Sequence, residues 1–175
     1  MTAHHLAQLN VGTLRHPLDD PRTHGFTSML DTLNDVADRA PGFVWRLVGD
    51  GGNDATAIRT PLGAEVIVNM SVWESRDSLR DYVYRSGHLD VLRRRAEWFE
   101  LPKTAFQVMW WIPAGHVPTV EEAVERLQHL RAHGPSPSAF GFRDSYMPAD
   151  AGLDVVTTDG HDQGPDPDRR LSAAR

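Results

Sequence analysis

Two segments of the sequence alternate with the period of a β-strand, and one side of each carries groups that are costly to bury. In residues 65–75 this side of the strand carries an amide, a hydroxyl and an indole N–H, from Asn69, Ser71 and Trp73. Residues 5–14 repeat the pattern, with Gln8 and Asn10 opposite an apolar side. Such a side meets either water or a cavity whose polar groups hold something. The chain therefore needs a sheet with two different faces.

Helical periodicity separates the strands. Apolar residues recur at three- and four-residue steps in 19–42, 75–100 and 118–134, and Ser86-Gly87 should bend or break the second of these helices. Strands are expected at 5–14, 43–48, 65–75 and 104–113. The order strand, helix, strand, strand, helix, strand predicts the α+β class, as a ferredoxin-like βαββαβ unit with an extra C-terminal helix.

The domain should span residues 4–143, because Gly, Pro and Asp accumulate beyond it and predict a disordered tail over 144–175. The two crossover helices should cover one sheet face and leave the other bare in a monomer. We expect that bare face to be apolar, with Leu6, Trp45 or Arg46, Ile67, Trp73, Met109 and Trp111. An apolar face of this kind predicts a homodimer whose sheets face each other or close into a barrel, a dimeric α+β barrel.

Charge and composition narrow the function classes. The formal net charge of −6 argues against nucleic-acid binding, which needs a basic face. The absence of cysteine excludes thiolate catalysis and cysteine-ligated metal sites. No apolar run approaches the length of a membrane span, and the N-terminus shows no signal-peptide pattern, so a cytoplasmic protein without a membrane partner is expected.

Several stretches of residues 4–143, among them "HLAQLNVG", "PGFVWRL", "VNMSVWES" and "WWIPAGHVPTVEEAVERLQHLRAHGP", are similar to the DUF3291 family of the dimeric α+β barrel superfamily. The chain also resembles the antibiotic-biosynthesis monooxygenases of that superfamily, whose anthrone oxygenases carry one strand asparagine and an Asn-x-x-x-Trp pair. Asn10 matches the first position, and Asn69 and Trp73 match the pair. The resemblance implies a cofactor-independent monooxygenase that uses O₂ on an aromatic or polyketide-like small molecule.

The expected chemistry gives these residues roles. Asn10 and Asn69 would donate hydrogen bonds to a developing oxyanion, and Trp73 would supply an apolar wall with one N–H. The structural alternative is that the asparagines only pair with other polar groups and that Trp73 is core. His88 is the candidate general base. Four further residues are expected to contact the substrate: Tyr84, Arg85, Trp111 and Trp45.

Other functions fit the same residues. A cyclase, isomerase or lyase could use the cavity with His88 as base, a non-catalytic dimer could only bind a ligand, and a helical histidine could hold haem. His129 and His133 are four apart, as metal ligands on a helix can be. Without a third ligand at recognised spacing they are better explained as surface residues, so no metal site is expected.

Overall fold

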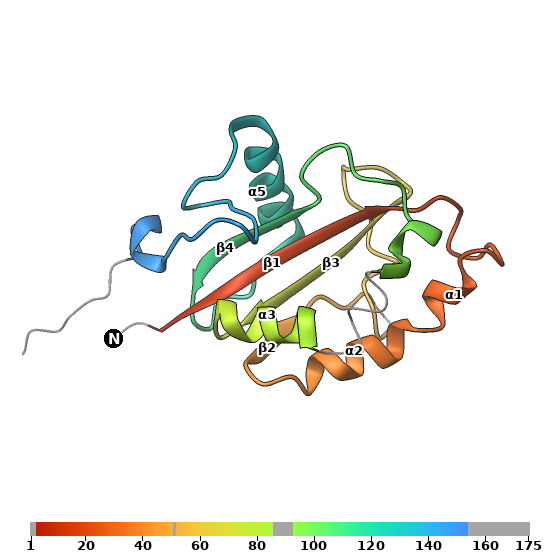
Figure 1. The fold of residues 1–175 in the computed structure, drawn as a ribbon, viewed down its shortest axis with the longest axis horizontal. Helices are drawn as coiled ribbons and strands as arrows, with labels where there is room; N and C mark the ends of the chain where they lie inside the picture. Colours follow the sequence, from red (N-terminus) through yellow and green to blue (C-terminus); the bar gives the residue numbers. More distant parts are fainter. Residues whose placement is uncertain (1–2, 51, 86–92, 154–175) are drawn as a thin grey trace, which may run out of the picture.

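The computed structural model describes residues 3–50, 52–85 and 93–153 and contains one antiparallel sheet. Its strands are β1 (His4–Thr13), β2 (Phe43–Arg46), β3 (Val66–Trp73) and β4 (Gln107–Pro113), in the spatial order β2-β3-β1-β4 (Figure 1). The two central strands are thus the two alternating segments of the sequence. This order and the helical crossovers confirm the α+β class and the ferredoxin-like unit.

The helices are shorter than the sequence predicts. The expected helix over 19–42 forms as α1 (His24–Thr27) and α2 (Leu30–Asp38). Between them the hydroxyls of Thr27 and Ser28 donate to the carbonyls of His24 and Gly25, a competing local bond that disfavours a continuous helix. The second expected helix gives α3 (Arg76–Arg85) and the short η1 (Arg95–Glu97), with Ser86-Gly87 outside the described residues.

The extra C-terminal helix is α5 (Val120–His133), followed by the short η2 (Pro148–Ala151). Thr119 caps α5 as its spacing to Glu122 predicts, because its hydroxyl accepts from the Glu122 backbone N–H at 3.1 Å. Within the described parts of the chain, no helix is long and apolar enough to cross a membrane.

Both faces of the sheet are covered by the chain's own elements. One face packs against α5, through a core that includes Leu9, Met70 and Trp110 from the strands and Leu127 from the helix. The opposite face packs against α3 and the segment around Phe140 at one end, and against Phe26, Trp98 and Phe99 at the other. In Figure 1, α5 accordingly lies on one side of the sheet and α1, α2 and α3 on the other.

The prediction of a bare sheet face was therefore wrong. Leu6, Trp73 and Met109, which were assigned to that face, are fully buried within a single chain. The crossover helices cover this face, and α5 occupies the face on which the sequence reading placed them. The apolar residues of these strands are thus explained without a second copy of the chain, and the homodimer stays a prediction without that argument.

The ordered structure continues past residue 143. The Asp144 carboxylate accepts from the Gly141 N–H at 2.8 Å, and the Tyr146 carbonyl accepts from the Trp111 indole at 2.9 Å. Arg76 donates to the carbonyls of Phe142 and Asp144. Residues 144–153 thus differ from the predicted disordered tail. The Trp111 indole of β4 and the Arg76 guanidinium of α3 hold this segment through its backbone carbonyls. Residues 154–175 lie outside the described part.

Candidate active site

A cavity of about 180 Å³ lies at one end of the sheet face that α1, α2 and α3 cover. Its apolar walls come from α1 and α2, from the segment before β4 and from β3, and include Phe26, Leu30, Leu33, Ile67, Phe99 and Phe106. Its polar lining comes from all sides and consists of Asn10, Asn34, Arg46, Asp54, Thr56, Asn69, Tyr82 and Arg95. An apolar space with a few convergent polar groups is the usual form of a small-molecule site.

Asn10 and Asn69 lie opposite each other on the two central strands, where the β1–β3 register pairs them directly. Both line the cavity; Asn10 is half-buried and Asn69 is exposed. Side chains of such a cross-strand pair stand about 5 Å apart at Cβ and point to the same face. The strand alternation thus brings two amides to one wall of the cavity.

A chain of buried hydrogen bonds continues from Asn10 away from the cavity. The Asn10 amide donates to the Gln8 carbonyl oxygen at 2.8 Å, and the Gln8 amide donates to the Ser71 hydroxyl at 3.0 Å. The Trp73 indole donates to the same hydroxyl at 2.9 Å. Gln8 and Ser71 are only 5% and 6% exposed, so these bonds satisfy groups that water does not reach. The chain orients the Asn10 amide, because one of its N–H donors is held by Gln8.

Trp73 itself does not line the cavity. It is fully buried and stacks on Tyr82, with ring centroids 5.0 Å apart and planes 27° from parallel. The Phe43 ring meets it edge-on at 5.3 Å. Tyr82, in contrast, lines the cavity. Its burial and the negative charge of Asp38 raise its pKa to about 12, although the positive charge of Arg46 acts in the opposite direction. The Tyr82 phenol therefore keeps its proton at neutral pH.

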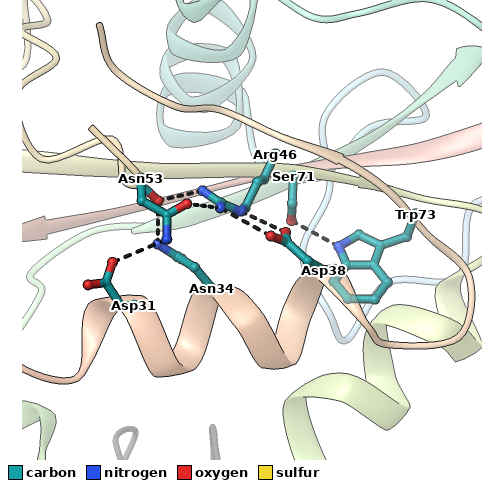
Figure 2. Close-up of polar contacts among 7 residues, drawn as sticks. All are labelled: Asp31, Asn34, Asp38, Arg46, Asn53, Ser71 and Trp73. Carbon is teal, nitrogen blue, oxygen red and sulfur yellow. Dashed lines mark hydrogen bonds and ion pairs between the residues drawn. The ribbon is translucent and has the colours of Figure 1, made fainter. Parts of the chain in front are cut away.

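A hydrogen-bonded cluster fixes the wall formed by α2 and the loop after β2 (Figure 2). Arg46 donates to both carboxylate oxygens of Asp38, at 2.7 and 3.2 Å, and to the backbone and side-chain oxygens of Asn53, at 2.7 and 2.6 Å. Asn53 in turn donates to Asp31 at 3.1 Å and accepts from Asn34 at 2.7 Å. The guanidinium of Arg46 is thus engaged by the protein itself, and Figure 2 shows it lying between the loop and α2.

Arg95 lies on the other side of the cavity and is held differently. Its guanidinium carbon is 4.2 Å from the centroid of the Phe106 ring and 5.9 Å from that of Phe99. The Phe99 ring packs directly against the backbone at Gly12, because a Cβ added to that glycine would stand 2.7 Å from the ring. Burial lowers the pKa of Arg95, although an arginine stays charged at any physiological pH.

Four of the other candidates from the sequence lie away from the cavity. Tyr84 is exposed and meets the Phe142 ring edge-on at 6.2 Å, and Arg85 pairs with Asp81 at 3.3 Å on the surface of α3. Trp111 packs with the segment around Phe140, away from the cavity. Trp45 faces α5, because the β2–β3 register shifts between Phe43 and Trp45. His88 lies outside the described residues.

Sequence reasoning missed the two arginines and Tyr82. Tyr82 lies two positions from the candidate Tyr84, and the helical phase of α3 would have separated a buried from an exposed position. Arg46 and Arg95 carry no local signal, since their partners come from distant segments. Within the described residues no cluster of three metal-ligating side chains occurs. His129 and His133 lie side by side on α5, 4.8 Å between ring centroids.

Comparison with known proteins gives one family and several distant structures. The family model described as "Domain of unknown function (DUF3291)" matches residues 5–154. The cofactor-independent oxygenase SnoaB of Streptomyces nogalater is 16% identical, with 65% of this chain and 95% of that chain covered and a TM-score of 0.43. Rv0793 of Mycobacterium tuberculosis is 12% identical, with 66% and 98% covered and a TM-score of 0.41.

A monooxygenase from the gene ActVA-Orf6 of Streptomyces coelicolor, in complex with nanaomycin D, is 14% identical, with 67% of this chain and 94% of that chain covered and a TM-score of 0.32. No protein of curated function matches the chain. Similarity at these scores carries no argument about chemistry, so a functional assignment has to rest on the residues of the cavity.

Proposed function

The chain belongs to the DUF3291 family, and we propose that it is a cofactor-independent monooxygenase that oxidises an aromatic or polyketide-like small molecule with O₂. The observation that carries the proposal is the pairing of Asn10 with Asn69 on one wall of an otherwise largely aromatic and aliphatic cavity. Two amides fixed on adjacent strands can donate to an oxyanion that forms on a flat substrate bound between the sheet and α2.

The reaction needs an electron-rich substrate with a CH₂ or phenol next to a conjugated carbonyl. Loss of one proton gives an enolate or phenolate, whose oxygen the amides of Asn10 and Asn69 stabilise. The anion transfers one electron to O₂, and the substrate radical and superoxide combine to a peroxide anion. This anion takes up a proton, and loss of water then converts the carbon that carries the peroxide, the former CH₂ or a ring C–H of the phenol, into C=O. One O₂ is consumed and one water is released for each substrate.

The protein's residues divide this work. Asn10 and Asn69 are the proposed oxyanion donors, and the protonated Tyr82 phenol borders the same space. Gln8, Ser71 and Trp73 act as positioning residues, because their hydrogen bonds set the direction of the Asn10 amide. His88 is retained as the proposed general base. Tyr84, Arg85, Trp45 and Trp111 have no part in the mechanism, since none of them lines the cavity.

The lining residues of the cavity in the described structure all belong to one chain, and the proposed reaction assigns no role to a partner subunit. A homodimer, a cytoplasmic location and a role in antibiotic or other secondary metabolism are further proposals. Light scattering of the purified protein tests the dimer separately from the chemistry. A monomer by that measurement would end the dimer proposal and leave the oxygenase proposal intact.

The test is oxygen consumption by the purified protein with 1,8-dihydroxyanthrone as substrate, in buffer with a metal chelator and no added cofactor. We expect one O₂ consumed for each anthraquinone formed, at a rate well above the buffer rate, and no visible absorbance from the protein itself. Turnover of the anthrone without oxygen would instead favour an isomerase or lyase. A Soret band in the protein's spectrum would favour haem. Either result would overturn the proposal.

A further inference from the structure

The two arginines of the cavity differ in what their charges contact. Four hydrogen bonds to Asp38 and Asn53 occupy the guanidinium of Arg46. Arg95 has no hydrogen-bond or ion-pair partner among residues 3–50, 52–85 and 93–153, and its contacts are the faces of Phe106 and Phe99. One cation is therefore part of the protein's framework, while the other lies half-buried at the cavity with no anionic partner in the described ranges.

The neighbouring Arg94 shows that the segment does not lack acidic partners. Its guanidinium forms two hydrogen bonds to the Glu97 carboxylate, both at 2.9 Å, on the exposed side of η1. The carboxylate that lines the cavity, Asp54, accepts instead from the backbone N–H and hydroxyl of Thr56, at 2.8 and 2.6 Å. In the part of the chain that the structure describes, the exposed arginine thus has an acidic partner and the cavity arginine has none.

A half-buried charge without a counter-ion is costly unless something pairs with it. The position of the guanidinium over two aromatic rings offsets part of this cost. It also leaves the N–H donors, which lie at the edge of the guanidinium plane, without protein acceptors in the described structure. A guanidinium in this state matches the geometry of a carboxylate, which accepts two parallel N–H donors.

We propose that Arg95 binds a carboxylate of the ligand, so that the substrates of this cavity are flat aromatic acids. The aromatic body would lie against Phe99 and Phe106, and its acid group would pair with the guanidinium that those rings support. A group that is charged when the ligand arrives is favoured over an anion formed only during turnover, because Arg95 has no anionic partner among the described residues of the protein without ligand. The inference deepens the proposed function and rests on it, since the ligand is taken to be the substrate of the same site.

The experiment is a fluorescence titration of the whole protein with 2-naphthoate and with 2-naphthalenemethanol, which has the same rings and no charge. Neither probe can undergo the proposed oxidation, so binding is measured apart from turnover. We expect 2-naphthoate to bind saturably and at least tenfold more tightly than the alcohol. Arg95→Gln should weaken naphthoate binding about 10- to 100-fold, the usual effect of losing hydrogen bonds to a charged group. Binding of the alcohol should not change.

Two further variants keep the result interpretable. Arg95→Lys keeps the charge without the fork of donors and should recover part of the affinity for naphthoate. Arg94→Gln removes the neighbouring arginine and should leave both probes unaffected. Unchanged binding of naphthoate by Arg95→Gln, or equal binding of the two probes by the native protein, would overturn the inference. Because oxygen consumption is measured separately, tight naphthoate binding with no oxidation of either 1,8-dihydroxyanthrone or its 3-carboxylate would instead reject the proposed function.

Discussion

The two faces of the sheet are built from the same strands and differ in kind. The face under α5 is apolar throughout the two central strands, with Ala7, Leu9 and Val11 opposite Val68, Met70 and Val72. The face under α2 and α3 carries, on the same strands, Gln8, Asn10, Asn69, Ser71 and Trp73. A single register therefore places a close-packed core on one side and hydrogen-bonding groups on the other.

The contrast shows how one sheet can combine stability and chemistry. The α5 face contributes the burial of apolar surface, because the side chains of its two central strands are almost fully removed from water and belong to one apolar cluster. The opposite face orients polar side chains, because a chain of hydrogen bonds fixes the positions of Asn10, Gln8, Ser71 and Trp73. Substitutions on the first face should therefore change the free energy of unfolding, and those at the cavity end of the second should change function.

The largest effect on stability is expected from Leu9→Ala, on the α5 face of β1. Leu9 is 1% exposed, and truncation of a buried leucine to alanine typically costs about 2 to 5 kcal/mol of unfolding free energy. Asn10→Ala, at the next position but on the other face, should cost less, about 1 kcal/mol, since it removes one hydrogen bond. Urea unfolding of both variants measures the difference, and equal losses would contradict the division between the faces.

An intermediate effect is expected from Ser71→Ala on the polar face. The substitution removes the shared acceptor of the Trp73 indole and the Gln8 amide, which are then buried without it, at a cost of about 1 to 3 kcal/mol. Trp73→Phe removes one of these donors, so a cycle of the two substitutions should show coupling of about 0.5 kcal/mol or more. Strict additivity in urea unfolding would mean that the hydrogen-bonded chain does not act as a unit.

The smallest effect is expected from Thr119→Ala at the start of α5. It removes the hydroxyl that accepts from the Glu122 N–H and should lower the unfolding free energy by about 1 kcal/mol, as the loss of a helix N-cap usually does. Because α5 lies on the face away from α2 and α3, oxidation of the anthrone by the folded variant should equal that of the native protein. A lower turnover by fully folded Thr119→Ala would show that the two faces are not independent.

The sequence predicts the alternation well and the packing partner of each face poorly. Strand periodicity correctly places Asn10 and Asn69 on one side, because side-chain direction in a strand is a local property. It cannot say which side the crossover helices cover, and α5 takes the face that the sequence reading assigned to them. Trp45 escapes prediction for a related reason, since the irregular register in β2 turns it toward α5 and leaves Arg46 beside Asp38.

The cavity's charged residues could not be found from sequence at all. Arg95 is distinguished from Arg93 and Arg94 in "RRR" only by the rings of Phe99 and Phe106 beneath it, and Phe106 reaches it through the fold. Arg46 is a framework residue only because Asn53 and Asp38 converge on it. Such roles depend on tertiary contacts, whereas periodicity and capping depend on neighbours along the chain.

The most direct test of the proposed site compares two amides on either side of Asn10. Asn69 pairs with Asn10 across β3 and lines the cavity, and Gln107 pairs with it across β4 and does not. Asn69→Ala should lower the rate of anthrone-dependent oxygen consumption about 10²-fold, the usual loss for one oxyanion donor, with little change in stability because the side chain is exposed. Gln107→Ala should keep the native rate. Full turnover by Asn69→Ala, or equal losses in both variants, would contradict a site at the polar face of the sheet.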